Sequence, residues 1–190
     1  MSTPILTVAN QLTILRMALT PFLVVLIVYH EFTWALVVYV VAGMTDLLDG
    51  LAARLGHQRT TLGAMLDPVA DKIFLSSAFV ALTWGSDLQV RMPMWLTVIT
   101  LSRDAMILVS VAIINLTLGR RVFYPSLLGK AATATQIVTA GAILLLNALS
   151  TGWAPLRYLL GLTLALTLAS ALHYVYQASA GPRPPAEQPR

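Results

Sequence analysis

Six long runs of mostly apolar residues fill this chain and limit what it can fold into. They cover about residues 9–29, 33–54, 60–84, 93–117, 126–149 and 153–177. A bilayer core of about 30 Å needs roughly 20 apolar residues in one helix, so each run can cross a membrane once. Only 11% of the residues are charged and 57% are hydrophobic, unlike an ordinary soluble domain. The sequence therefore predicts an all-α integral membrane protein with six transmembrane helices.

The chain reads as one membrane domain, residues 1–180, followed by a proline-rich tail. Residues 181–190 contain four prolines, and we expect this tail to be disordered. Basic residues are concentrated in segments 54–59 and 118–124 and in the tail, whereas the opposite side offers mainly Arg91 and Arg157. By the positive-inside rule both termini face the cytoplasm. We therefore expect a multi-pass protein of a bacterial cytoplasmic membrane.

Composition also excludes several function classes. The chain has no cysteine, which removes disulfides, thiolate metal ligands and cysteine nucleophiles. Its net charge of +4 comes from scattered residues that flank the apolar runs. Such residues orient membrane spans and meet anionic lipid headgroups, so we expect membrane lipids as partners and no nucleic acid.

Aspartates inside the second and third apolar runs are the feature that most strongly indicates chemistry. The chain has eight acidic residues, and four of them lie in these two runs: Asp46, Asp49, Asp67 and Asp71. One aspartate at the bilayer centre costs about 2.5–3.5 kcal/mol, so four unpaired ones would cost on the order of 10 kcal/mol. Divalent cations can offset this cost, because carboxylate oxygens are the ligands that Mg²⁺ and Mn²⁺ prefer.

The spacing of the aspartates predicts one shared site. Asp46 and Asp49 are three positions apart and Asp67 and Asp71 are four apart, so each pair lies on one helix face. A short loop joins the two helices, and both pairs come to a similar depth in the cytoplasmic half of the bundle. Carboxylates at that range cannot all stay ionised without cations between them. Two alternatives are protonated, hydrogen-bonded carboxylates and a proton- or cation-coupled transporter.

This stretch resembles the signature of the CDP-alcohol phosphotransferase family. It fixes eight positions over 26 residues, and the six-helix prediction agrees with the family fold. The matching positions are Asp46, Asp49, Gly50, Ala53, Arg54, Gly63, Asp67 and Asp71.

The resemblance implies a role for each position. The four aspartates would hold two divalent ions, Mg²⁺ or Mn²⁺, that bridge the pyrophosphate of CDP-diacylglycerol, and Asp71 would also be the general base. The acceptor is a glycerol-type alcohol, and CMP is the leaving group. By the same resemblance the protein would be a homodimer. The CDP moiety would contact Gly50, Ala53, Arg54 and Gly63, with Asn10 and Thr13 from the first run.

The identity of the acceptor alcohol depends on a different segment. Phosphatidylglycerophosphate synthases of this family show a Lys-x-Lys-Thr pattern at the start of the fifth run, whereas this chain has Lys130-Ala131-Ala132-Thr133. One phosphate anchor is therefore missing, and other stretches are similar to the family's eukaryotic-type cardiolipin synthases. We prefer phosphatidylglycerol as the acceptor, with glycerol 3-phosphate as the alternative. Residues that could bind the acceptor or its phosphate are Arg103, Lys130, Arg120 and Arg121.

Other polar residues within the runs have a structural role, a functional role, or both as alternatives. Arg103 could bind a phosphate or form a structural pair with a neighbouring helix, and we assign Asp104 a structural role. Arg16 could line the nucleotide pocket or extend to the membrane interface. Gln136 suggests that the fifth run gives a polar lining to the same cavity.

Overall fold

A computed structural model of the chain describes residues 8–56, 61–117 and 126–179, with side chains for 13–45, 69–110 and 126–177. The described residues form six α-helices and no strand, so the all-α prediction is confirmed for this part of the chain. Every helix boundary lies within three residues of the predicted one. The helices are α1 (Val8–Val28), α2 (Phe32–Gly56), α3 (Thr61–Trp84), α4 (Met94–Thr117), α5 (Leu127–Ala148) and α6 (Leu156–Ser179).

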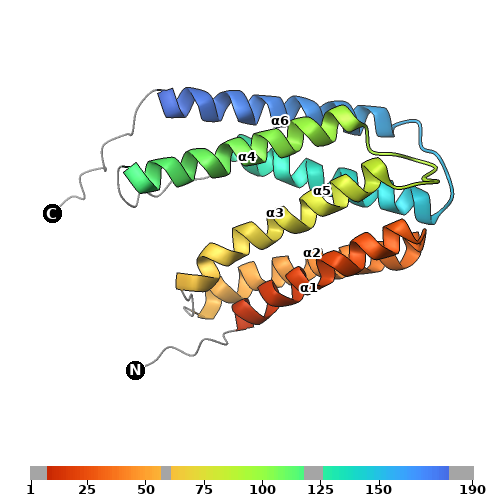
Figure 1. Cartoon of the computed structure of the whole chain (residues 1–190), viewed down its shortest axis with the longest axis horizontal. Coiled ribbons are helices and arrows are strands. Elements are labelled where there is room, and N and C mark those ends of the chain that lie inside the picture. The colour runs from red at the N-terminus through yellow and green to blue at the C-terminus, as the bar shows by residue number, and fades with distance from the viewer. Residues whose placement is uncertain (1–7, 57–60, 118–125, 180–190) are drawn as a thin grey trace.

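The helices pack side by side in a bundle in which α3 occupies a middle position (Figure 1). The helix α3 packs against α1 on one side and against α4 on the other, and it also contacts α5. The α1–α2, α3–α4 and α5–α6 connections gather at one end of the bundle, whereas α1 begins and α6 ends at the opposite end (Figure 1). We call the end with the three connections the connection end, and the end where α1 begins and α6 ends the terminal end.

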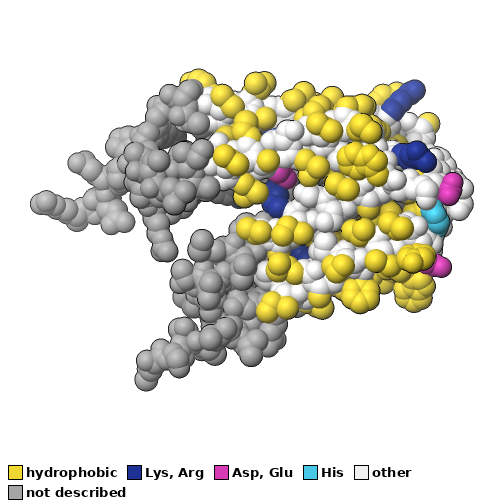
Figure 2. Space-filling view, in the orientation of Figure 1, with side chains coloured by type: hydrophobic (Ala, Val, Ile, Leu, Met, Phe, Trp, Pro, Cys, Tyr) yellow, Lys and Arg dark blue, Asp and Glu magenta, His cyan; other side chains and the backbone are white. Residues whose placement is uncertain are grey.

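The surface of the bundle suits a lipid environment. Among the described side chains, large apolar ones are exposed along the helices, and several charged ones lie at the connection end (Figure 2). Among the described residues, α5 and Leu156–Gln177 are long and apolar enough to cross a membrane, and Thr13–Val28 and Phe32–Thr45 are shorter apolar helices. The prediction of six helices is thus confirmed, whereas the prediction that all six cross the membrane remains a prediction.

Exposed tryptophans lie at the connection end, where a membrane interface would be expected to have them. Tryptophan prefers the level of the lipid headgroups, where its ring meets apolar groups and its N–H meets water. All four tryptophans of the chain lie close to the ends of helices at the connection end, and all four are exposed: Trp34, Trp84, Trp95 and Trp153.

One buried asparagine fixes the α3–α4 connection to α5. The Asn147 side-chain oxygen accepts hydrogen bonds from the backbone N–H groups of Gln89 and Val90, at 3.0 and 3.2 Å. Its amide nitrogen donates to the carbonyl oxygens of Val90 and Ile143, each at 2.8 Å. Asn147 is 3% exposed, so its side-chain hydrogen bonds replace the water that this segment would otherwise need.

Hydroxyl and amide groups connect α5 to α6 along the seam between them. The Thr139 and Thr163 hydroxyl oxygens are 2.7 Å apart, and the Gln136 amide nitrogen donates to the Thr167 hydroxyl at 3.1 Å. These four side chains are fully buried. Interhelical hydrogen bonds of this kind contribute about 0.6–2 kcal/mol each within a bilayer.

Candidate functional site

A cavity of about 120 Å³ lies among α1, α2, α3 and α5. Three charged side chains line it among the described residues: Arg16 of α1, and Asp71 and Lys72 of α3. Its remaining wall is mostly apolar, with Ala42, Gly43, Phe74, Leu75 and Ile137 among its residues. Charged groups at the edge of an apolar cavity favour an amphipathic ligand over a small polar one.

An ion pair between α1 and α3 lies at this cavity. The Arg16 guanidinium Nη1 donates to the Asp71 carboxylate oxygen Oδ1. The Arg16 side chain is 3% exposed and that of Asp71 is 40% exposed. Arg16 therefore lies inside the bundle and does not extend to the membrane interface, which was one of the two interpretations of the sequence.

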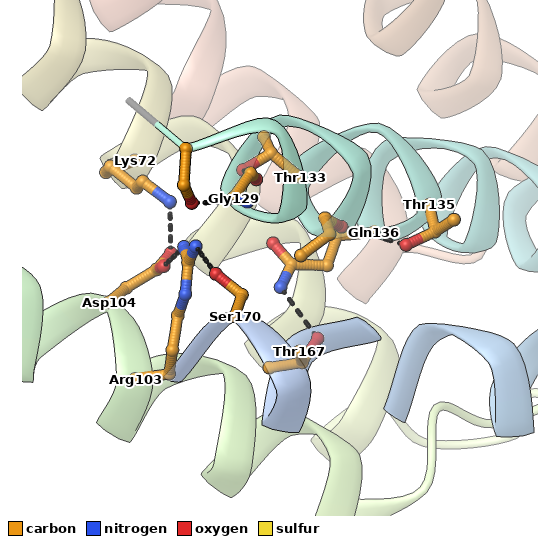
Figure 3. Close-up of polar contacts among 11 residues, drawn as sticks. Lys72, Arg103, Asp104, Gly129, Thr133, Thr135, Gln136, Thr167 and Ser170 are labelled. Atoms are coloured by element: carbon orange, nitrogen blue, oxygen red, sulfur yellow. Dashed lines mark hydrogen bonds and ion pairs between the residues drawn. The ribbon is translucent and has the colours of Figure 1, made fainter. Parts of the chain in front are cut away.

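A second charge cluster begins at the next residue of α3. The Lys72 ammonium donates to Asp104 Oδ2 at 2.6 Å, and Arg103 Nη1 donates to Asp104 Oδ1 at 2.7 Å. Arg103 Nη2 also donates to the Ser170 hydroxyl of α6 at 2.6 Å (Figure 3). The carboxylate of Asp104 thus joins α3 to α4, and the Arg103 guanidinium joins α4 to α6.

The Arg103 guanidinium also lies against the first turn of α5. A Cβ atom on Gly129 would lie 3.3 Å from Arg103 Nη2, so a larger residue there would require the guanidinium to move by a few tenths of an ångström. Ser126 caps the same turn, because its hydroxyl accepts the Gly129 N–H at 3.0 Å. Arg103 is 7% exposed, and its Nε has no hydrogen-bond partner among the described residues. Lys130, the next residue of α5, is exposed.

An aromatic side chain closes the cavity on the α2 side. The Tyr39 hydroxyl donates to the carbonyl oxygen of Ile137 in α5 at 2.9 Å, and its ring stacks on Phe74 of α3 with centroids 5.6 Å apart. Gly141 leaves space for the ring, since a Cβ there would lie 3.4 Å from Tyr39 Cε1. Tyr39 therefore ties α2, α3 and α5 together beside the charged groups.

The described side chains include part of the predicted site. Asp71, Arg103 and Lys130 have the positions given above, and Thr13 is buried in α1, 3% exposed, one turn before Arg16. The other predicted side chains lie outside the described ones: Asn10, Asp46, Asp49, Gly50, Ala53, Arg54, Gly63, Asp67, Arg120 and Arg121.

One expectation about the cavity lining is wrong. Gln136 does not line this cavity, because it faces α6 and bonds to Thr167; the α5 residues at the cavity are Thr133 and Ile137. Thr133 and Ile137 are four positions apart and share a helix face, whereas the Gln136 side chain leaves the helix about 100° from that of Ile137 and bonds to α6. Gln136 Oε1 is buried without a hydrogen-bond partner among the described residues.

Sequence reasoning missed two residues, Tyr39 and Ser170. A signal existed for Ser170, since Thr163, Thr167 and Ser170 follow one another at steps of four and three positions and so form one polar stripe on an apolar helix. For Tyr39 the sequence offers only an aromatic residue in the middle of an apolar run, which is also typical of ordinary packing.

The described carboxylate at the cavity fits a hard divalent cation. Its donors are oxygens, the ligand type that Mg²⁺ and Mn²⁺ prefer. Asp71 Oδ1 accepts from Arg16, whereas Oδ2 makes no hydrogen bond to a described residue. Among the described side chains, no group of three or more His, Cys, Asp or Glu gathers in one place. The complete ligand set therefore stays a prediction.

Comparison with known proteins shows that most of the chain matches the model of one protein family. Residues 6–173 match the family model for the CDP-alcohol phosphatidyltransferases. The chain is 40% identical over 159 residues to a protein of Streptomyces coelicolor named cardiolipin synthase (CMP-forming), covering 78% of this chain and 69% of that protein.

Two further relatives differ in coverage and in name. A human protein named cardiolipin synthase (CMP-forming) is 43% identical over 106 residues, which cover 55% of this chain and 34% of the human protein. A Mycobacterium tuberculosis protein named probable phosphatidylglycerophosphate synthase is 34% identical over 146 residues, covering 72% of this chain and 65% of that protein. The chain thus spans about a third of the human relative.

Proposed function

The chain belongs to the CDP-alcohol phosphatidyltransferase family, a membrane-embedded family of transferases, and from this premise we propose that it makes cardiolipin. In the proposed reaction a free glycerol hydroxyl of phosphatidylglycerol attacks the lipid-linked phosphorus of CDP-diacylglycerol. The new oxygen–phosphorus bond forms as the bond from that phosphorus to the CMP oxygen breaks. CMP leaves, and the hydroxyl proton passes to the Asp71 carboxylate.

The observation that carries this proposal is the position of Asp71 at the edge of a mostly apolar cavity. A general base for this reaction must reach a hydroxyl whose attached chains are lipid, and the cavity offers a carboxylate next to apolar side chains of α2, α3 and α5. Arg16 holds one oxygen of this carboxylate, which fixes its orientation and stabilises its ionised form.

Divalent ions complete the proposed site. Asp46, Asp49, Asp67 and Asp71 would hold two Mg²⁺ or Mn²⁺ ions, which stabilise the negative charge that develops on the pyrophosphate. Gly50, Ala53, Arg54, Gly63, Asn10 and Thr13 would contact the CDP moiety.

Charge balance across the α1–α3 ion pair and the second cluster supports a lipid acceptor. Arg16, Lys72 and Arg103 give three positive charges against two negative charges from Asp71 and Asp104, which leaves +1 among these groups. Phosphatidylglycerol carries one negative charge on its phosphodiester, whereas glycerol 3-phosphate carries close to two, which would require more free cations. The Arg103 guanidinium already bonds to Asp104, so it is suited to bind a ligand with one negative charge rather than two.

The fifth helix supports the same acceptor. The second lysine of the Lys-x-Lys-Thr pattern corresponds to Ala132, which is fully buried. A lysine there would place an ammonium group at a buried position, with a high desolvation cost. The alternative acceptor, glycerol 3-phosphate, is favoured by the name of the mycobacterial relative and by the exposed Lys130 in the first turn of α5.

A direct assay tests the proposal. Purified full-length chain receives CDP-diacylglycerol with Mg²⁺ or Mn²⁺, then either phosphatidylglycerol or glycerol 3-phosphate, and CMP is measured. We expect release with phosphatidylglycerol and loss of release with EDTA. CMP release with glycerol 3-phosphate but not with phosphatidylglycerol would show that glycerol 3-phosphate is the acceptor. No CMP release with either acceptor, together with cation uptake into proteoliposomes, would support the transporter and reject the enzyme.

Substitution of the general base sharpens this test. We expect Asp71→Asn to lower CMP release at least about 100-fold, because general base catalysis contributes that much or more. Asp87→Asn is the matched control, since Asp87 is an exposed carboxylate at the connection end with 87% side-chain exposure. Full activity of Asp71→Asn would show that Asp71 is not the general base.

A further inference from the structure

Arg16 is the buried cation that contacts the carboxylate proposed as general base. It lies within α1, 2% exposed, and a lone cationic side chain at that depth is costly unless it has a charged partner. Asp71 provides one across the α1–α3 interface. Arg16 was expected from the sequence to line the nucleotide pocket or to extend to the membrane interface, and neither interpretation gives it a role toward Asp71.

We propose that Arg16 is the resident counter-ion of Asp71 and that divalent cation competes with it for this carboxylate. The proposal rests on the proposed function, because it takes Asp71 to be a metal ligand. Oδ1 already accepts a hydrogen bond from Arg16, and the guanidinium repels a second cation at the same group. Arg16 therefore lowers the affinity for metal and, in the metal-free site, holds α1 against α3 through this ion pair.

Lys72 does not share this role, although it follows Asp71 in the sequence. Successive helix residues point about 100° apart, and the Lys72 ammonium bonds to Asp104 of α4 at 2.6 Å. The two neighbouring cations of the cavity thus serve different carboxylates. This separation supplies a matched pair of variants: Arg16→Met and Lys72→Met each remove one positive charge, and only the first removes it from Asp71.

The experiment measures metal binding and thermal unfolding without CDP-lipid. Mn²⁺ is titrated into purified full-length protein and followed by electron paramagnetic resonance, and the melting temperature is recorded with and without saturating Mn²⁺. For Arg16→Met we expect Mn²⁺ affinity to rise roughly tenfold. We also expect a metal-free melting temperature about 5 °C lower, which Mn²⁺ restores. For Lys72→Met the Mn²⁺ affinity should change less than about threefold, and Mn²⁺ should restore none of its stability loss.

Further variants separate the outcomes. Arg16→Lys keeps a positive charge on a long aliphatic side chain. We expect its Mn²⁺ affinity to be intermediate between those of wild type and Arg16→Met. In an Asp71→Asn background, Arg16→Met should leave Mn²⁺ affinity unchanged. Equal affinity in wild type and both Arg16 variants, or an equal rise in Lys72→Met, would overturn the counter-ion role while leaving the proposed function intact. Failure of the wild-type protein to bind Mn²⁺ would overturn the metal assignment and this proposal together.

Discussion

Removal of the Asp104 charge should destabilise the bundle strongly. Asp104 bonds to two cations from different helices, Lys72 and Arg103, and all three side chains are less than a third exposed, at 8%, 26% and 6% respectively. In Asp104→Asn both cations lose their only carboxylate partner among the described residues. Truncating one member of a buried ion pair costs about 3–5 kcal/mol. Because Lys72 is partly exposed and can reach water, we expect about 2–4 kcal/mol.

For a chain of this length each kcal/mol shifts the melting temperature by about 2–4 °C. Asp104→Asn should therefore melt roughly 5–15 °C below wild type in detergent solution, followed by far-ultraviolet circular dichroism or by aggregation onset. Asp104→Glu, which keeps the charge, should recover at least half of the loss. Asp87→Asn, an exposed carboxylate at the connection end, should melt within about 1 °C of wild type.

A double variant tests the stated cause. If the loss comes from unpaired buried cations, removing one of them should recover stability, because replacing both partners of a buried pair by apolar groups is often neutral. Asp104→Leu combined with Lys72→Met should therefore melt above Asp104→Leu alone. A melting temperature of Asp104→Asn within 2 °C of wild type, or a double variant less stable than the single one, would refute the reasoning.

Two further predictions concern other parts of the bundle. Asn147→Leu should lower stability by about 2–3 kcal/mol, because buried backbone groups of the α3–α4 connection lose their partners; limited proteolysis should then cleave within 85–93 before other sites. Gly129→Ala should displace the Arg103 guanidinium by the few tenths of an ångström that the 3.3 Å approach demands. We expect this variant to raise KM for phosphatidylglycerol about threefold to tenfold, with little change in melting temperature. An unchanged KM would show that Arg103 does not bind the acceptor.

The helices could be predicted from the sequence because a bilayer leaves few alternatives. Apolar runs of about 20 residues, interrupted at polar or glycine-containing segments, can satisfy their backbone groups in lipid only as helices. The predicted and observed ends differ most at the start of α6, which begins at Leu156 instead of 153. A turn occupies this difference, since the Leu156 N–H donates to the Trp153 carbonyl at 3.0 Å.

The partners of the charged side chains could not be predicted in the same way. The period of a helix says which residues share a face, but it does not say which helix that face meets. Arg103 was expected to bind a ligand or pair with a neighbouring helix, and it contacts Ser170 of α6 while its Nε has no hydrogen-bond partner in the described part of the chain. Gln136 was expected at the cavity because it is a polar residue further into the fifth run than Lys130, yet helix packing turns it toward α6.

The consecutive residues Asp71 and Lys72 show how one helix can serve two parts of a reaction. Their side chains leave α3 about 100° apart, and α3 lies between α1 on one side and α4 on the other (Figure 1). Asp71 therefore meets Arg16 of α1, and Lys72 meets Asp104 of α4. Because Asp104 also holds Arg103, the proposed general base and the proposed acceptor-binding cation are positioned by a single rigid helix. In the bundle without metal or substrate, a movement of α3 would therefore change both ion pairs at once.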